Sequence, residues 1–147
     1  MPYRNHVNNP EISVLMSVHN GEPFLRKSIE SILSQTFTNF EFILIDDCSS
    51  DNSSSIIKYY AQNDARIKYI ENPKWLQLTR SLNVGLEIAK GEYIARQDAD
   101  DISLPDRLQS QLKFMKTNIK VGVLGTSAEY IDEKDETILI SRRPTNK

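Results

Sequence analysis

The sequence predicts an α/β protein with a mainly parallel sheet and helices on both of its faces. Short, nearly continuous apolar runs, such as residues 12–16 and 40–45, are typical of strands that helices cover on both sides. Segments with apolar residues at helical spacing separate these runs, and this alternation favours parallel strands joined by crossover helices. The length of 147 residues fits one compact domain with a single core.

The N-terminal third is expected to contain a strand, a helix and a second strand. Residues 12–16 are almost entirely apolar, as in a buried strand. Turn residues at 20–23, among them a proline suited to a first helical turn, then start a helix. The apolar residues of this helix follow helical spacing: Leu25, Ile29, Ile32 and Leu33. Residues 40–45 form the second strand and run directly into Asp46 and Asp47.

The middle of the chain continues the alternation. Residues 49–53 carry turn and N-cap chemistry, and the helix that follows is marked by Ile56, Ile57 and Tyr60. Residues 67–70 are a weaker strand. A helical stripe comes next, formed by Leu78, Leu82, Leu86 and Ala89 and ended by Gly91. Residues 93–95 are the fourth strand, which leads into the acidic residues 98–101.

The pattern continues more weakly beyond the acidic residues. A further helix opens at Leu104 and Pro105, and its apolar side consists of Leu108, Leu112 and Met115. Residues 121–125 are expected to form a strand, and residues 138–140 another. We expect a single domain at 11–141, with flexible tails at 1–10 and 142–147.

Composition excludes several classes of function. Hydrophobic residues make up 39% of the chain and charged residues 26%, which is ordinary for a soluble protein. The net charge of -2 and the lack of a cluster of Lys and Arg give no indication of nucleic-acid binding. No apolar run approaches the roughly 18 residues that span a bilayer, and the N-terminus lacks the apolar core of a secretory signal. The single cysteine, Cys48, cannot form an internal disulfide, so a cytoplasmic location is expected.

Polar side chains gather where the expected strands end, and ligands bind outside the carboxyl ends of strands in an open α/β sheet. Ser17 and His19 follow the first strand, Asp46 and Asp47 the second, and residues 98–101 the fourth. Five carboxylates at one edge would repel one another strongly unless something neutralised them, and a divalent cation would do so. All-oxygen ligation suits magnesium, manganese or calcium rather than zinc.

The spacing of Asp98 and Asp100 sharpens this interpretation. They are two residues apart, so in an extended segment both carboxylates face the same side. Magnesium-type ions usually take one or two protein carboxylates and fill the other positions with water and substrate phosphates. The segment therefore predicts a metal site for a phosphorylated ligand. The alternative for this Asp-x-Asp is a surface turn, and the alternative for Asp46 and Asp47 is N-capping together with Asp51.

Several other residues have two interpretations or a structural one. His19, without another His or Cys nearby, is not expected to bind a metal, and it either contacts a base or is a simple loop residue. Trp75 is expected to pack beneath a loop, and Cys48 to fill a turn position rather than act as a nucleophile. Arg80 and Arg96 are candidates to offset phosphate charge.

With these residues in view, the chain resembles the inverting family 2 glycosyltransferases, which have a GT-A fold with a Rossmann-like sheet. The matching segments appear in the family's order: residues 13–22, 31–37, 42–51, 82–85 and 89–101. The most telling of them is the last, AKGEYIARQDADD. The resemblance covers residues 12–125, and the combined pattern is highly specific.

The resemblance implies a role for each matching residue. The nucleotide would bind to residues from three loops: Ser17, His19, Glu22, Asp46, Asp47 and Asp98. Within this set, Asp47 would accept a hydrogen bond from the base, and Asp98 would lie near the ribose or the sugar. Asp100 would bind the Mn²⁺ or Mg²⁺ that bridges the diphosphate, and Asp101 would support the loop or the sugar. The family usually has tyrosine where His19 stands and glycine where Cys48 stands.

The resulting hypothesis is the donor-binding domain of a glycosyltransferase. The resemblance implies transfer of a sugar from a nucleoside diphosphate sugar, with UDP as the nucleotide, to a saccharide or lipid-linked acceptor. It also implies a place in surface polysaccharide or glycolipid synthesis, with peripheral association at the inner face of the membrane. The family's general base lies in a later segment, so no catalytic base is assigned, and Asp132, Glu133 and Asp135 are expected to be solvated.

Three alternatives compete with this hypothesis. The first is a nucleotide- or metal-binding α/β module without transferase chemistry. The second is a phospho-accepting signalling domain, whose acidic pair normally follows the first strand, whereas Asp46 and Asp47 follow the second. The third is a nucleotidyltransferase, which typically needs a glycine- and lysine-rich phosphate loop that this sequence lacks.

Overall fold

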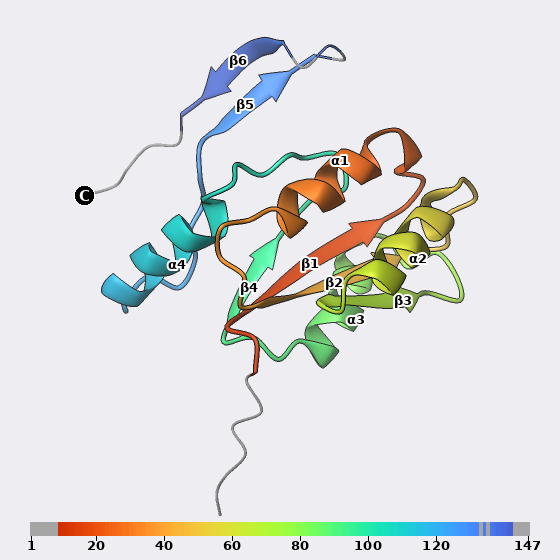
Figure 1. Cartoon of the computed structure of the whole chain (residues 1–147), viewed down its shortest axis with the longest axis horizontal. Coiled ribbons are helices and arrows are strands. Elements are labelled where there is room, and N and C mark those ends of the chain that lie inside the picture. Colours follow the sequence, from red (N-terminus) through yellow and green to blue (C-terminus); the bar gives the residue numbers. More distant parts are fainter. Residues whose placement is uncertain (1–8, 133, 135, 143–147) are drawn as a thin grey trace, which may run out of the picture. The chain divides into compact units, whose positions relative to one another are not determined.

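A computed structural model describes residues 9–132, 134 and 136–142, and the chain divides into two compact units, one ending at Ser110 and the other beginning at Gln111. The first unit holds a four-stranded parallel sheet with the strand order β3-β2-β1-β4 (Figure 1). Its strands are β1 (Ile12–Val18), β2 (Phe40–Asp46), β3 (Ile67–Glu71) and β4 (Tyr93–Arg96). The predicted α/β class is confirmed.

Helices cover both faces of this sheet. They are α1 (Glu22–Leu33), α2 (Ser53–Asn63) and α3 (Leu78–Ile88), whereas the boundary between the two units falls within α4 (Arg107–Thr117). The chain passes from β1 to β2 to β3 in one direction, so right-handed crossovers place α1 and α2 on one face. It then returns past β1 to reach β4, which places α3 on the opposite face (Figure 1). Helices on both faces were the sequence-based expectation.

Alternate residues of the central strands form two layers of core. Leu15, Ile43 and Ile45 pack with Leu82 of α3 on one face. Gly85 lets α3 approach closely, because a Cβ there would lie 2.9 Å from the side chain of Ile45. The other layer consists of fully buried residues of the sheet and of the first two helices: Val14, Met16, Val18, Phe42, Leu44, Leu25, Ile29, Ile32 and Ile57.

A buried polar cluster joins the amino ends of β1 and β2 to the segment before β4. Glu41 is 4% exposed, and its Oε1 accepts hydrogen bonds from Ser13 Oγ and from the backbone N–H of Lys90, both at 2.6 Å. The backbone N–H of Gly91 donates to Ser13 Oγ at 2.8 Å. A Cβ on Gly91 would lie 2.3 Å from the backbone nitrogen of Ser13. This approach of the chain to β1 therefore requires glycine.

The second unit contains an antiparallel hairpin of β5 (Ala128–Ile131) and β6 (Thr137–Ser141). The strand expected at 138–140 is confirmed within β6. The strand expected at 121–125 is wrong, because that segment is irregular and pairs with no strand among the described residues. Its two glycines leave few side chains to pack on a pleated surface. Asp132, expected to be solvated, is half-buried and accepts N–H groups of Lys134 and Glu136.

Some sequence-based expectations fall largely outside the described residues. The predicted tails at 1–10 and 142–147 do so almost entirely, and Glu133 and Asp135 do so completely. The single domain predicted at 11–141 spans both compact units and stays a prediction. Within the part of the chain that the structure describes, none of the helices has both the length and the apolarity that a membrane span needs.

Candidate functional site

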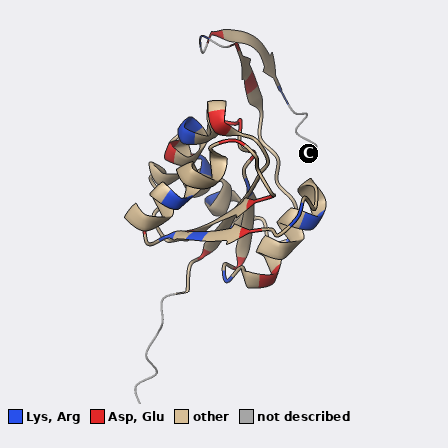
Figure 2. Cartoon of the chain, turned by 90° about the vertical axis from the view of Figure 1, so that its right-hand side faces the viewer, with Lys and Arg blue, Asp and Glu red and all other residues tan. Residues whose placement is uncertain are grey.

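The carboxyl ends of all four strands of the first unit lie at one edge, because the strands are parallel. β4 pairs with β1 although the chain reaches it only after β3, so the strand order reverses between β1 and β4. Open α/β sheets bind ligands at such a switch point. The loops after β1 and β4 flank this point, and the loop after β2 lies next to them. Figure 2 marks the acidic residues of these loops in red.

The loops after β1 and β2 are fastened to each other by hydrogen bonds. Asn20 Oδ1 accepts the backbone N–H of Ser50 at 2.7 Å, and the backbone N–H of Gly21 donates to Ser53 Oγ at 2.9 Å. A Cβ added to Gly21 would lie 3.5 Å from the Cβ of Ala99, so the loop after β1 also touches the acidic loop after β4. Three segments that are distant in sequence therefore meet at the switch point.

Asp47 is 1% exposed and connects β2 to the loop after β3. Its Oδ1 accepts hydrogen bonds from Asn72 Nδ2 and from the backbone N–H of Leu76, both at 2.8 Å. Its Oδ2 is buried and has no hydrogen-bond partner among the described residues. Asn72 also donates to Ser81 Oγ at 3.1 Å, and Ser17 Oγ donates to the same oxygen at 2.8 Å. Asn72 and Ser81, which the sequence analysis missed, thus join the predicted residues Ser17 and Asp47.

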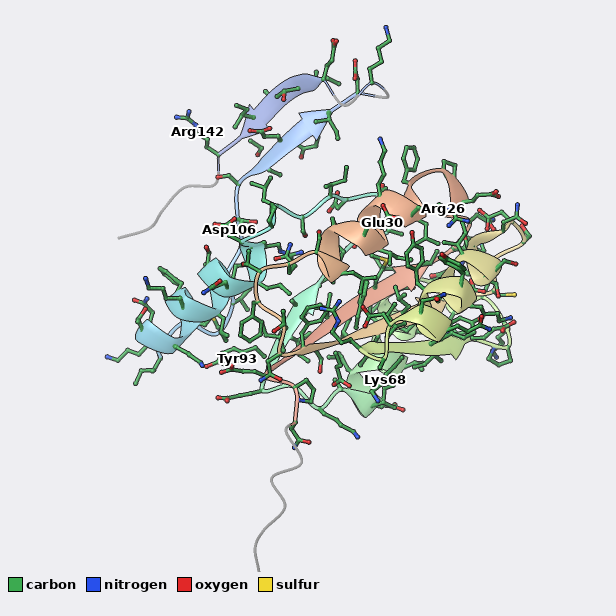
Figure 3. The ribbon with its side chains drawn as sticks, in the orientation of Figure 1. Arg26, Glu30, Lys68, Tyr93, Asp106 and Arg142 are labelled. Atoms are coloured by element: carbon green, nitrogen blue, oxygen red, sulfur yellow. The ribbon has the colours of Figure 1, made fainter. Side chains whose placement is uncertain are left out.

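Two other acidic residues predicted to contact the nucleotide also hold the loops. Asp46 is buried, and its Oδ1 accepts the backbone N–H of Ser49 at 3.1 Å, which closes the turn after β2. Both carboxylate oxygens of Glu22 accept hydrogen bonds from Asn52, at 2.7 and 3.1 Å. Glu22 lines a shallow pocket of about 400 Å³ between α1 and α2, together with Arg26, which Figure 3 labels. The structure therefore gives Asp46 and Glu22 protein partners of their own.

The loop after β4 carries three carboxylates with different surroundings. Asp98 forms a bidentate ion pair with Arg96, whose Nε donates to Oδ1 at 3.0 Å and whose Nη2 donates to Oδ2 at 2.9 Å. Asp100 is exposed, and its side chain has no hydrogen bond or ion pair with any described residue. Burial raises the pKa of Asp101, and the charges of Asp98 and Asp100 raise it further, against the lowering effect of Arg107. The negative charge of this loop is therefore only partly offset by the protein.

A divalent cation at this edge would bind to carboxylates whose charge the protein leaves uncompensated. Arg96 neutralises Asp98, and neutral N–H groups partly stabilise the charges of Asp46 and Asp47, so the crowding at this edge does not by itself require an ion. Asp100 and Asp101 offer carboxylate oxygens, which are the ligands that a hard cation prefers. No group of three or more His, Cys, Asp or Glu among the described residues could hold a metal. An ion at Asp100 would therefore take its other ligands from water and a phosphorylated ligand.

Gln97 supports the acidic loop from below. It is 3% exposed, and its Nε2 donates to the backbone carbonyl of Asp101 at 2.8 Å. Its Oε1 accepts hydrogen bonds from Ser103 Oγ at 2.7 Å and from Arg107 Nη1 at 2.6 Å. Arg107 also donates to the backbone carbonyl of Arg96 at 2.7 Å. Gln97 and Arg107 were not predicted from the sequence, because a glutamine or an arginine beside an acidic motif gives no local signal of the hydrogen bonds it will make.

An aromatic pair lies beside Asp47. The rings of His19 and Trp75 are stacked, with their centroids 5.2 Å apart and an angle of 18° between their planes. His19 Nδ1 lies 2.9 Å from the backbone carbonyl of Asp47, so this nitrogen carries the proton and donates it. Trp75 was expected to pack beneath a loop. That expectation is wrong, because its side chain is 58% exposed.

Backbone strain gathers at the same edge. Among the described residues, three that are not glycine have a positive φ: Asn20 (54°), Cys48 (62°) and Gln77 (67°). They lie in the loops after β1, β2 and β3, respectively. Left-handed backbone at residues other than glycine is a strain that proteins concentrate at functional sites. The expectation that Cys48 occupies a turn position is consistent with its φ.

Cys48→Gly is expected to stabilise the chain by about 0.5–1 kcal/mol, because glycine adopts a positive φ without steric cost. Chemical denaturation followed by circular dichroism would measure the change. Ser49→Gly is the matched control, since Ser49 has no positive φ, and it should be destabilising. An equal loss of stability in both variants would contradict the assigned strain.

Comparison with known proteins agrees with this arrangement. Residues 13–147 match the family described as Glycosyl transferase family 2. EpsE of Bacillus subtilis, which carries a glycosyltransferase name, is 46% identical over 125 residues, which are 84% of this chain and 45% of EpsE. The O-antigen biosynthesis glycosyltransferase WbnJ of Escherichia coli is 37% identical over 138 residues, 92% of this chain and 53% of WbnJ. This chain thus spans about half the length of both relatives or less.

Solved structures share the fold. TarS 1-349 of S. aureus, in complex with UDP-GlcNAc, superposes with a TM-score of 0.69 at 23% identity, over 82% of this chain and 40% of that one. The mannosyltransferase PcManGT of Pyrobaculum calidifontis, in complex with GDP-Man and Mn²⁺, gives 0.68 at 19% identity, over 86% and 37%. The family match covers more than half of the chain, and the fold agrees with it. This chain therefore belongs to glycosyltransferase family 2.

Proposed function

We propose that residues 11–141 are the donor-binding domain of a glycosyltransferase that takes a sugar from a nucleoside diphosphate sugar. The observation that carries this proposal is the meeting of Ser17, Asp47 and the loop 98–101 around one switch point, from three separate parts of the sequence. Membership of the family supports sugar transfer as the reaction. An inverting course and a saccharide or lipid-linked acceptor follow from the same resemblance.

The nucleotide is proposed to bind with its base toward Asp47 and its diphosphate toward Asp100. The unpartnered Oδ2 of Asp47 supports this orientation, because a buried acceptor gains most from a ligand N–H group. UDP is the proposed nucleotide because the resemblance implies it. The fold is shared by a protein in complex with UDP-GlcNAc and by one in complex with GDP-Man, so both bases belong in the test.

Mn²⁺ or Mg²⁺ is the proposed cofactor, with Asp100 as its protein ligand. The free carboxylate of Asp100 and the raised pKa of Asp101 support this assignment. When bound, the ion would stabilise the negative charge that develops on the leaving nucleoside diphosphate. Asp98, held by Arg96, is proposed to lie near the ribose or the sugar.

Surface polysaccharide or glycolipid synthesis is the proposed pathway, in the cytoplasm and at the inner face of the membrane. The name of the relative WbnJ, an O-antigen biosynthesis glycosyltransferase, supports the pathway. The general base and the acceptor site are proposed to lie outside residues 1–147, as they do in the family. We assign no catalytic base within the described residues.

Asp100→Ala is expected to abolish the metal dependence of UDP binding. In the unchanged chain, UDP should bind at least about tenfold more tightly with Mn²⁺ than with a chelator, since one metal–phosphate contact is worth more than about 1.4 kcal/mol. The variant should bind UDP equally under both conditions, because it lacks the proposed ligand. Isothermal titration calorimetry measures both affinities.

Asp106→Ala is the control for this experiment, because Asp106 (labelled in Figure 3) lies on the same connection outside the acidic loop and should leave the metal dependence intact. Equal UDP affinity with and without chelator in the unchanged chain would remove the metal from the proposal. If neither UDP nor GDP bound at all, the proposed function itself would be wrong.

A further inference from the structure

The two rings of the aromatic pair come from different loops and meet at the carboxyl edge of the sheet. His19 follows β1, and Trp75 lies between β3 and α3. Their planes are 18° apart, so they form a stack rather than an edge-to-face contact. Because 58% of the Trp75 surface is exposed, much of the indole is open to a ligand. Exposed aromatic faces of this kind bind bases by stacking, which tolerates different base types.

Asp47 positions both rings. Its backbone carbonyl accepts the N–H of His19 Nδ1 at 2.9 Å, and its Oδ1 accepts the N–H of Leu76, the residue after Trp75, at 2.8 Å. The remaining oxygen, Oδ2, is buried and has no hydrogen-bond partner within the described part of the chain. Asp47 therefore holds the aromatic stack in place and also provides the acceptor without a partner among the described residues. A planar heterocycle with a ring N–H group matches both features.

We infer that Trp75 is a nucleobase-stacking residue, with its indole as the platform and His19 as the support behind it. The stack covers one face of each ring, and the exposed indole is the larger of the two aromatic surfaces, so we assign the stacking contact to Trp75. The stack holds the indole in place before the ligand arrives, which lowers the entropic cost of binding. This inference rests on the proposed function and names a residue that positions the donor.

The test uses the 147-residue chain and the fact that Trp75 is its single tryptophan. UDP binding, established independently by calorimetry in the presence of Mn²⁺, should change the tryptophan emission, because the base contacts the indole. Inorganic pyrophosphate with Mn²⁺ has no base and should leave the emission unchanged. Trp75→Ala should weaken UDP binding about 5- to 150-fold, the range for losing one base–aromatic stack. It should leave pyrophosphate binding as it was.

Trp75→Phe is the rescue variant, since it keeps an aromatic face and should restore most of the UDP affinity. Tyr59→Ala is the matched control: Tyr59 is 56% exposed, but it lies on α2 within the helix, and its loss should not affect UDP binding. Normal UDP affinity in Trp75→Ala, or unchanged emission at saturating UDP, would overturn the inference and leave the proposed function standing. If the unchanged chain failed to bind UDP and GDP, both would be overturned.

Discussion

Gly91→Ala is expected to lower the free energy of unfolding by at least about 3 kcal/mol, because the new methyl group would overlap the backbone of β1. A Cβ at this position would lie 2.3 Å from the nitrogen of Ser13 and 2.6 Å from the carbonyl carbon of Ile12. These atoms belong to a strand that pairs with a neighbour on each side. They cannot rotate away as a side chain would, so β1 or the segment before β4 must move.

Movement there would also break the buried cluster at the amino ends of the strands. Ser13 Oγ accepts the N–H of Gly91 and donates to Glu41, whose other oxygen already lacks a partner among the residues that the structure describes. Urea denaturation followed by circular dichroism measures the loss. Gly125→Ala is the control, because nothing lies within 4 Å of a Cβ at that position, and it should change stability by less than about 0.5 kcal/mol. Equal unfolding midpoints for the two variants would show that β1 tolerates the clash.

The sheet of the first unit was predictable because burial on both faces leaves a simple trace in the sequence. All seven residues of β2 are buried, and a strand in that environment must be a nearly continuous apolar run. The same signal misled at residues 121–125, where an apolar run includes two glycines. Whether such a run becomes a strand depends on a neighbour with which it can pair, and a single sequence does not show that neighbour.

Within the candidate site, the sequence predicted only residues whose types commonly bind ligands or metals. Asp47 and Asp100 could be identified as site candidates from the sequence alone, because they are acidic residues at strand ends. Their binding roles stay predictions. The partners that hold these residues are ordinary in type. Asn72 donates to Asp47 across 25 positions of sequence, and Trp75 stacks on His19 across a longer separation. These contacts form only after the strand order is established, so no local sequence pattern predicts them.

Gln97→Leu is expected to cost about 3–5 kcal/mol of stability and to weaken the Mn²⁺-dependent part of UDP binding. Leucine keeps the volume but leaves the hydroxyl of Ser103 and one N–H of Arg107 without this acceptor, and the carbonyl of Asp101 without its donor. These groups are at least partly buried, so water cannot fully replace the hydrogen bonds that they lose. The loop that carries Asp100 would then lose the hydrogen bonds by which Gln97 joins it to Ser103 and Arg107.

Two measurements separate the structural effect of Gln97→Leu from the functional one. Urea unfolding gives the stability, and calorimetry at a temperature where the variant stays folded gives UDP affinity with Mn²⁺ and with chelator. Affinity should fall with Mn²⁺ and stay nearly constant with chelator, since Asp47 and the base end of the site do not depend on Gln97. Gln109→Leu is the matched control, because Gln109 is exposed and accepts one bond, from Thr36 at 3.2 Å. If the two variants unfolded alike, the buried network would not be what fixes the acidic loop.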